Sequence, residues 1–340
     1  MMPNSSADPR PGIARAVPSP AAADEGRGLR VAIILPAFNE QSTIVPTIRA
    51  FHEALPGAEI VVVDNNSSDE TAALALEAFA MLGAEARLIK ETRQGKGYAV
   101  RRAFTDVRAD IYVLADADMT YPADRVRDLI RPIVADDADM VVGNRLAAGR
   151  YAEENKRPLH NMGNRLVLAM VNHLFHATLG DIMSGYRALS RSFVAHYPIL
   201  VEGFEIETDM TLHALDKRFR VAEIPIEYSA RPIGSVSKLR TFTDGRRVLS
   251  TIVKVVRYYR PMLFFGVAAL AFASAGLLAA IPVISDWINY QYIYHVPLAI
   301  LSTGLEILAS LSLAVGLILD SVVHLERLAY ERDLRPRDIG

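Results

Sequence analysis

The chain has 340 residues, of which 51% are hydrophobic and 22% are charged, so it holds enough apolar side chains for one large or two ordinary folded domains. Its 37 Lys and Arg residues and 39 Asp and Glu residues leave a net charge of -2, which excludes the basic excess that recruits nucleic acid. The absence of cysteine excludes a disulfide scaffold, a thiolate zinc site, an iron–sulfur cluster and cysteine catalysis.

Residues 1–29 are rich in Pro, Ala, Ser and Gly and contain no long apolar run. This composition predicts a disordered tail. A secretory signal needs about 7 to 15 uninterrupted apolar residues, and Arg10, Arg15 and several prolines interrupt this segment. We therefore expect the N-terminus to stay in the cytoplasm.

From Arg30 onward, short apolar runs alternate with amphipathic segments. The runs are VAIIL, IVVVD, ARLIK, IYVLAD and MVVGN. Runs of this kind, separated by segments with helical periodicity, are typical of a parallel sheet that helices cover on both faces. The pattern predicts an α/β domain over residues 30–240, with five strands by residue 144.

Two long apolar segments predict membrane-spanning helices within residues 261–323. Pro261 to Ser285 is 25 residues without a charge, or roughly 37 Å as a helix, which exceeds the ~30 Å hydrocarbon core. The second segment, Val296 to Leu319, carries one charge, Glu306. A carboxylate is costly in lipid, so we expect Glu306 to face a partner or another subunit, and a homo-oligomer through the membrane-spanning helices is one such arrangement. The alternative is a pair of buried core helices.

Cations flank the two apolar segments on one side only. The connector between the segments has no Lys or Arg, whereas cations precede the first segment and follow the second, namely Arg246, Arg247, Lys254, Arg257, Arg260, Arg327, Arg332, Arg335 and Arg337. The positive-inside rule then predicts that both termini are cytoplasmic, including a tail at 324–340. Residues 241–260 predict an amphipathic helix along the bilayer surface, and the alternative is a soluble helix packed on the α/β domain.

The stretch IYVLADADMTYP ends a predicted buried strand with Asp116 and Asp118. Their two-residue spacing places both carboxylates on one face. Two converging carboxylates make a hard oxygen site, which suits Mg²⁺ or Mn²⁺ that keeps waters and is completed by substrate phosphates. Open α/β sheets bind ligands at the carboxyl ends of their strands, which favours a ligand site over an exposed acidic loop.

Two common nucleotide-binding motifs are missing. The first strand runs into LPAFNE instead of a Gly-rich turn, and no GxxxxGK[ST] occurs, which excludes dinucleotide dehydrogenases and P-loop proteins. Asp64 ends the second strand, where it can accept hydrogen bonds from a ribose or a base. Lys96 stands between two glycines before a predicted helix, an arrangement that suits a phosphate, and a mobile surface lysine is the alternative.

Several motifs follow one another in the order and at the approximate spacing of one family. They are LPAFNE, VVDNNSSDET, GKGYAV, DADMTYP, VVGNR, DIMSGYRALSR, FEIET and EIPIEYSARPIGSVSK. Residues 30 to about 240 resemble glycosyltransferase family 2, which has the GT-A fold. Together with its C-terminal part, the chain resembles the polyprenyl-phosphate glycosyltransferases related to dolichol-phosphate mannose synthase.

The resemblance implies a role for several residues on the donor side. The residues that would hold the nucleotide are Pro36, Asn39, Glu40 and Asp64. Lys96 would lie near the diphosphate, and Asp116 and Asp118 would bind Mg²⁺ or Mn²⁺. Many relatives carry Gln two residues after the second Asp, where this chain has Thr120, so water or Thr120 would take that place in the metal site.

On the acceptor side, Asp181 matches the D-x-x-S-G-[FY]-R pattern and would lie beside the sugar as a weak base, as an orienting group for the sugar or as a helix-associated cap. Arg145 and Arg187 would contact phosphate. The segment that leads the chain towards the membrane would contribute Arg231, Ser237 and Lys238. We expect Asp181, Asp118 and Arg145 to be the catalytic residues.

The expected reaction is an inverting transfer of a sugar from a UDP- or GDP-linked donor to a membrane polyprenyl phosphate, undecaprenyl or dolichyl. A phosphate monoester is largely dianionic at neutral pH, since its second pKa is ~6, so it hardly needs a general base. Arginine forks would screen its charge. Two alternatives remain open: a membrane-tethered glycosyltransferase with a hydroxyl acceptor in a glycan, lipid or protein, and a non-catalytic membrane scaffold.

Overall fold

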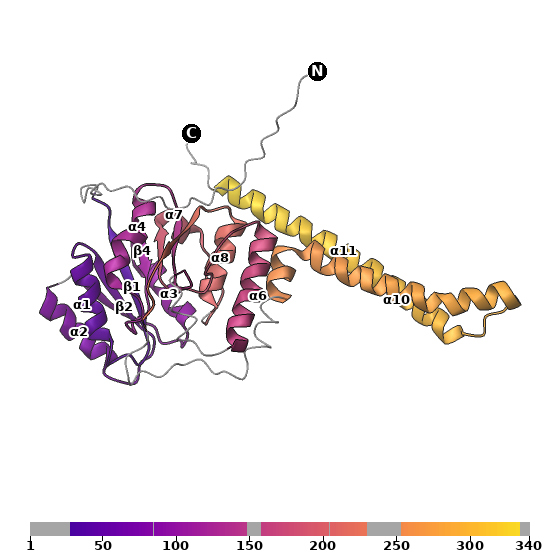
Figure 1. Ribbon diagram of the computed structural model, residues 1–340, viewed down its shortest axis with the longest axis horizontal. Coiled ribbons are helices and arrows are strands. Elements are labelled where there is room, and N and C mark those ends of the chain that lie inside the picture. Colours follow the sequence, from indigo (N-terminus) through magenta and orange to yellow (C-terminus); the bar gives the residue numbers. More distant parts are fainter. Residues whose placement is uncertain (1–27, 84, 148–157, 204, 230–252, 334–340) are drawn as a thin grey trace, which may run out of the picture. The chain divides into compact units, whose positions relative to one another are not determined.

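The computed structural model describes residues 28–83, 85–147, 158–203, 205–229 and 253–333 (Figure 1). The chain divides into two compact units, with the division between Phe242 and Thr243. The first unit is a seven-stranded sheet with helices, and the second contains two long helices. Of the predicted tail at 1–29, residues 1–27 lie outside the described residues. Of the predicted tail at 324–340, residues 334–340 lie outside them.

The first unit alternates strands and helices, as the sequence predicts. Its strands are β1 (Val31–Ala37), β2 (Glu59–Asp64), β3 (Ala86–Lys90), β4 (Ile111–Leu114), β5 (Met140–Asn144), β6 (Arg187–Ser190) and β7 (Val221–Pro225). Its helices are α1 (Ile44–Ala54), α2 (Thr71–Leu82), α3 (Lys96–Asp106), α4 (Val126–Val134), α6 (Pro158–Phe175), α7 (Arg191–His196) and α8 (Ile206–Asp216), with a short 3-10 helix at Ala123–Arg125.

The strand order is β3-β2-β1-β4-β6-β5-β7, and the sheet is mixed. The five predicted strands all form, but β6 runs antiparallel between β4 and β5. The five predicted strands therefore share one direction, as expected, and the antiparallel strand β6 is an addition that the sequence did not predict. The four-residue strand β6 carries Arg187 in its sequence RALS, and so lacks the long apolar run that marks the other central strands.

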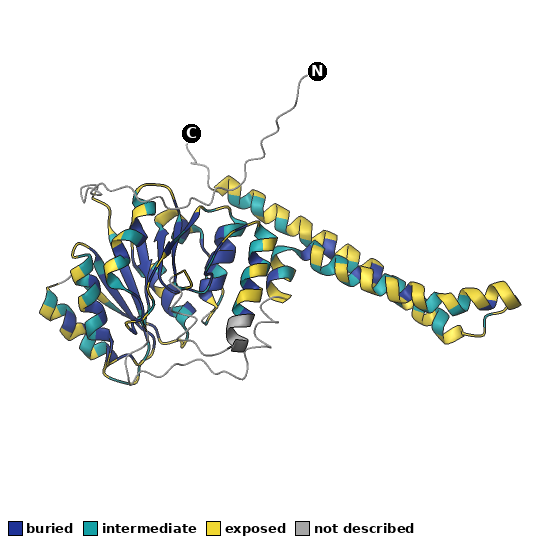
Figure 2. Cartoon of the chain, viewed as in Figure 1, coloured by how far each residue is buried: buried dark blue, intermediate teal, exposed yellow. Residues whose placement is uncertain are grey.

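Helices cover both faces of the sheet. The chain moves from β1 to β2 to β3 in one direction and then returns to β4, so right-handed connections place α3 on the face opposite α1 and α2. One face packs into a hydrophobic cluster with α1, formed by Ile33, Leu35, Ile44, Ile48, Phe51, Ile60 and Val62. In Figure 2 the inner strands are mostly buried, whereas Ile89 is the one buried residue of the edge strand β3.

The reversal of strand order between β1 and β4 positions the site. Strands β1, β2 and β4 are parallel, so their carboxyl ends lie at one edge of the sheet. Loops that leave adjacent strands in opposite directions open a crevice at such a switch point. Asp116 and Asp118 follow β4 at this edge, and Asp64 ends β2.

The second unit holds two candidate membrane spans, α10 (Pro261–Tyr290) and α11 (Val296–Asp333). Their mean hydropathies are 2.3 and 1.9, and only 6% and 11% of their most apolar stretches are buried within the chain. Figure 2 shows both helices mostly exposed, which does not fit the alternative of buried core helices. Both helices continue beyond the predicted spans, and α11 reaches Asp333 because no Gly or Pro interrupts residues 320–333.

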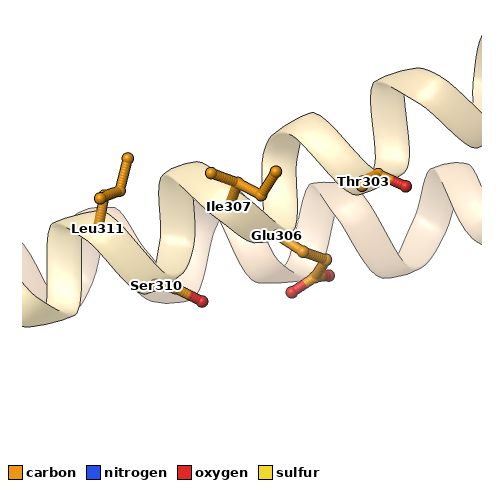
Figure 3. A pocket seen from close by; sticks show the side chains of 5 residues that line it. All are labelled: Thr303, Glu306, Ile307, Ser310 and Leu311. Carbon is orange, nitrogen blue, oxygen red and sulfur yellow. The ribbon is translucent and has the colours of Figure 1, made fainter.

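The two long helices pack closely around Gly276 on α10. Ser302 on α11 donates a hydrogen bond from Oγ to the Gly276 carbonyl at 2.9 Å. Glu306 lies one turn further along, over the place where a Cβ on Gly276 would stand. Figure 3 shows Thr303, Glu306 and Ser310 along one side of α11. Of the predicted amphipathic segment at 241–260, residues 253–260 are described, and 253–259 of them are helical.

Candidate active site

Asn39 joins the loops that follow β1 and β2. It adopts a left-handed backbone conformation, with φ 52°, which asparagine tolerates better than most residues. Its backbone N–H donates to Ser67 Oγ at 3.0 Å, and its Oδ1 accepts from the Ser68 N–H at 2.8 Å. These two hydrogen bonds hold the β1 and β2 loops together where the nucleotide pocket is predicted.

The other predicted nucleotide residues lie at the same edge of the sheet. Pro36 and Ala37 of β1 are paired in register with Val63 and Asp64 of β2. Asp64 Oδ1 accepts from the Ser67 N–H at 3.1 Å.

Glu40 follows Asn39 and is buried. Its N–H donates to Thr71 Oγ1 at 2.8 Å, and its Oε2 accepts from Thr43 Oγ1 at 3.1 Å. Ser67 thus contacts both Asn39 and Asp64, and the role of Pro36, Asn39, Glu40 and Asp64 in holding a nucleotide stays a prediction.

Glycines hold the loop that carries Lys96 close to a neighbouring segment. Gly95 has φ 146°, and a Cβ on either Gly95 or Gly97 would collide with backbone carbonyls of residues 201 and 202. The Gly97 N–H donates to the Glu202 carbonyl at 3.0 Å. Asn65, at the end of β2, accepts from the Gly95 N–H at 2.8 Å. These contacts fix the start of α3.

Lys96 lies between two carboxylates. Its Nζ is 2.5 Å from Asp116 Oδ1 and 2.5 Å from Glu207 Oε1, and its side chain is 10% exposed. Burial lowers the pKa of Lys96, but Asp116 and Glu207 raise it by more, so the net pKa lies above its usual value and the ammonium stays charged. The alternative of a mobile surface lysine was therefore wrong.

Sequence reasoning assigned no role to Glu207. It stands near the start of α8, in the motif FEIET, and its side chain is 8% exposed. An acidic residue in the first turn of a helix usually complements the helix dipole, so the local pattern gives no sign of a partner 111 positions away. The motif itself was the available signal.

The turn from Asp181 to Arg187 closes over this cluster. The Gly185 N–H donates to the Tyr121 hydroxyl at 2.8 Å. A Cβ on Gly185 would stand 3.0 Å from Lys96 Nζ and 3.2 Å from Asp116 Oδ2. The motifs GKGYAV, DADMTYP and DIMSGYR, which are far apart along the chain, thus meet at one place.

Asp118 and Thr120 form a local pair. Asp118 is 2% exposed, and its Oδ1 accepts from Thr120 Oγ1 at 2.6 Å and from the Thr120 N–H at 3.2 Å. The Thr120 hydroxyl therefore acts on Asp118, in the position where many relatives carry Gln.

The oxygen atoms that Asp116 and Asp118 offer as ligands fit a divalent cation. Asp116 and Asp118 supply carboxylate oxygens, the ligands that Mg²⁺ and Mn²⁺ prefer. Among the described residues, no group of three or more His, Cys, Asp or Glu could hold a metal ion. A metal at these two residues would therefore need further oxygens from water and from a diphosphate.

Arg145 and Asp181 form a two-pronged ion pair. Arg145 Nε lies 2.8 Å from Asp181 Oδ2, and Nη2 lies 3.0 Å from Oδ1. Asp181 is 3% exposed and also accepts from the Met183 N–H at 3.0 Å. The guanidinium stands over the ring of Tyr228, 5.6 Å from its centroid. Arg145 and the Met183 N–H thus engage both oxygens of the Asp181 carboxylate, and the role of Asp181 beside the sugar stays a prediction.

Arg187 has partners of a different kind. It is fully buried, and its guanidinium donates to the carbonyls of Ser184 and Ile182, each at 2.8 Å, and to Thr211 Oγ1 at 2.9 Å. These contacts support the 181–187 turn from inside the protein, and the full burial of Arg187 does not fit its predicted contact with phosphate. Arg231, Ser237 and Lys238 lie outside the described residues.

Comparison with known proteins supports the resemblance. The profile of Glycosyl transferase family 2 matches residues 32–197. Glycosyltransferase AglJ of Haloferax volcanii is 28% identical over 303 residues, covering 89% of this chain and 96% of AglJ. The dolichyl-phosphate hexose transferase of the same organism is 29% identical, covering 66% of this chain and 93% of that enzyme.

A solved structure shares the fold. Glucosyl-3-phosphoglycerate synthase from Mycobacterium tuberculosis, in complex with Mn²⁺, UDP and phosphoglyceric acid, has a TM-score of 0.51 and 23% identity, covering 67% of this chain and 78% of that one. The catalytic unit thus has a GT-A fold, followed in the chain by two candidate membrane spans. The chain belongs to glycosyltransferase family 2 and is a glycosyltransferase.

Proposed function

We propose that the enzyme transfers a sugar from a nucleoside diphosphate sugar to a membrane polyprenyl phosphate, with inversion at the anomeric carbon. The observation that carries this proposal is the joining, in one chain, of a GT-A unit to two long apolar helices. The similarity to a dolichyl-phosphate hexose transferase over 93% of that enzyme supports a lipid phosphate acceptor. The products are a lipid-linked sugar and a free nucleoside diphosphate.

In this proposal the donor lies at the carboxyl ends of β1, β2 and β4. Pro36, Asn39, Glu40 and Asp64 hold the nucleoside of the donor, which is a UDP- or GDP-linked sugar. Lys96 stays protonated beside the diphosphate, where its charge offsets part of the phosphate charge.

Asp116 and Asp118 would hold Mg²⁺ or Mn²⁺ against the diphosphate, in line with the Mn²⁺ and UDP in the related fold. When bound, the metal supplies charge stabilisation to the departing nucleoside diphosphate. Thr120 orients Asp118 through its hydroxyl. Lys96 keeps the charge of Asp116 balanced in the absence of metal.

On the acceptor side, an oxygen of the lipid phosphate attacks the anomeric carbon. The new carbon–oxygen bond forms as the bond to the diphosphate breaks, and the phosphate dianion has no proton to lose. Arg145 binds this phosphate, and Asp181 holds the Arg145 fork in place through Nε and Nη2. Arg231 and Lys238 remain predicted contributors.

The proposal places the enzyme in a membrane through α10 and α11, with the catalytic unit and both termini in the cytoplasm. The cations beside the predicted spans support this orientation.

A single assay tests the function. The purified full-length chain is incubated with a panel of radiolabelled UDP- and GDP-sugars and with undecaprenyl or dolichyl phosphate, and label is followed into the organic phase. We expect transfer from one donor that requires the lipid phosphate. Label on a non-phosphorylated glycan, lipid or protein would favour the hydroxyl acceptor instead. Absence of transfer with every donor and acceptor would favour a scaffold.

A further inference from the structure

Asn144 and Glu223 form a hydrogen-bonded pair beside the Arg145–Asp181 ion pair. Asn144 ends β5, Glu223 stands in the middle of the neighbouring strand β7, and Asn144 Nδ2 donates to Glu223 Oε2 at 3.1 Å. Asn144 is 8% exposed. Neither residue has a role in the reaction as proposed above.

Each member of this pair holds the backbone on one side of the ion pair. Asn144 Oδ1 accepts from the N–H groups of Leu146 and Ala147, at 2.9 and 3.0 Å, and so shapes the turn that carries Arg145. Glu223 Oε1 accepts from the N–H groups of Gly180 and Asp181, both at 2.9 Å. The two loops that carry Arg145 and Asp181 are therefore joined through one side-chain pair.

We infer that the Asn144–Glu223 pair is a positioning clamp that sets the orientation of the Arg145–Asp181 ion pair for the acceptor. The inference rests on the proposed function only for the nature of that acceptor. A bidentate fork is directional, so a small rotation of either loop misdirects the guanidinium. A misplacement of about 1 Å can cost on the order of 10²-fold in rate.

The packing around Gly180 shows how tightly the clamp is built. A Cβ on Gly180 would overlap the Asn144 amide and would lie 3.1 Å from Glu223 Oε2. The Gly180 N–H is within 2.9 Å of both oxygens of Glu223. Glycine is thus required here for the close approach of the loop to the side-chain pair.

The donors around Glu223 make a sharp test possible. Both carboxylate oxygens face N–H donors, so Glu223→Gln must point its amide NH₂ at a donor in either orientation. Asn144→Asp alone sets two carboxylates against each other. In the double variant, the NH₂ of the new glutamine donates to the new aspartate, and the glutamine oxygen accepts from the backbone. The double variant thereby keeps one negative charge and the hydrogen bond between positions 144 and 223, with the donor now at 223 and the acceptor at 144.

The experiment compares four full-length proteins: the unaltered chain, N144D, E223Q and the double variant. Each is assayed with the donor and acceptor that give the highest transfer of label with the unaltered chain. We expect each single change to lower kcat about 10- to 100-fold with the donor KM nearly unchanged, and the double change to recover most of the loss. We also expect E223Q to add little to the loss caused by R145A, because both act through Arg145. E77Q, an exposed change on α2, is the matched control.

A purely structural role would give a different result. In that case the single variants would lose thermal stability and donor binding in parallel with kcat, or the double variant would be no better than either single one. Either result overturns the clamp. The proposed function fails separately, if the unaltered chain labels a hydroxyl acceptor and not the lipid phosphate, and the clamp is then judged with that acceptor.

Discussion

Lys96 Nζ and Asp116 Oδ1 are 2.5 Å apart, in an ion pair that Glu207 completes from α8 at the same distance. The pair joins the predicted diphosphate-binding lysine to a predicted metal ligand. In the proposed reaction, a nucleoside diphosphate and its metal would bring opposite charges to this place, which Lys96 and Asp116 would complement. Substitutions in this cluster should therefore affect turnover, and those that leave a buried charge unpaired should also affect stability.

Lys96→Met should leave Asp116 and Glu207 facing each other without a cation. We expect turnover to fall by about 10²-fold and the thermal unfolding midpoint to drop, because breaking a buried pair costs on the order of 3–5 kcal/mol. Steady-state kinetics and thermal unfolding measure the two effects. Lys90→Met, at an exposed position on β3, is the control, and equal behaviour of the two variants would contradict the role of Lys96.

Asp118→Asn should abolish most of the transfer and weaken Mn²⁺ binding, while the fold remains. A metal supplies several kcal/mol of charge stabilisation, so we expect a loss of about 10²-fold or more. Chelation should inactivate the unaltered enzyme to a similar extent. Mn²⁺ binding followed by electron paramagnetic resonance gives a readout that does not depend on turnover. Asp137→Asn, at an exposed position, should change neither property, and full activity of Asp118→Asn in chelator would refute the metal site.

Arg145→Ala should raise the KM for lipid phosphate and lower kcat strongly, whereas Arg145→Lys should recover only part of the loss because an ammonium cannot pair with Asp181 in two-pronged fashion. The rate of the unaltered enzyme should fall as the pH drops below ~6, since the acceptor then becomes a monoanion. Arg108→Ala, an exposed change, serves as the control. A harmless Arg145→Ala, together with label on a hydroxyl acceptor, would favour the alternative function.

Gly185→Ala should place a methyl group against Lys96 Nζ and Asp116 Oδ2, at 3.0 and 3.2 Å. The side-chain ends can shift, so we expect the protein to fold with a modest loss of stability, about 1–3 kcal/mol, and about 10-fold lower turnover. Gly57→Ala has nothing within 4 Å of the added atom and is the matched control. Unfolding curves and kinetics of both variants decide the outcome, and unchanged turnover in Gly185→Ala would show that the cluster tolerates displacement.

Glu91 supports the loop before Lys96 and gives a pH-dependent prediction. The hydrogen bond from the Arg93 side chain lowers the pKa of Glu91 from 4.5 to about 2. A carboxylate with a lowered pKa stabilises the fold fully above its unfolded-state pKa, and this contribution is lost as the pH falls from about 4.5 towards 2. Glu91→Gln should therefore lower the thermal midpoint clearly at pH 7 and less at pH 3.5. The opposite trend would contradict the assignment, and Glu85→Gln, which is exposed, should show no such trend.

Local patterns in the sequence determined much of the architecture. The apolar run before Asp116 predicts β4, and the uncharged stretch from Pro261 to Ser285 predicts most of α10, because both signals depend on residues close together in the chain. The motifs also placed Asp64 at the end of β2 and Lys96 at the start of α3, where the structure has them, whereas β4 ends at Leu114, two residues before Asp116.

Only the tertiary structure decided which groups meet. Four features depend on residues that are distant in the chain. They are the insertion of β6 between β4 and β5, the burial of Arg187, the ion pair of Glu207 with Lys96 and the ion pair of Arg145 with Asp181. The local sequence pattern around an arginine on a short strand predicts a surface cation. In the structure, however, the Arg187 guanidinium is buried and donates hydrogen bonds to backbone carbonyls of its own turn. Such contacts depend on the packing of the whole sheet, which periodicity and local charge do not encode.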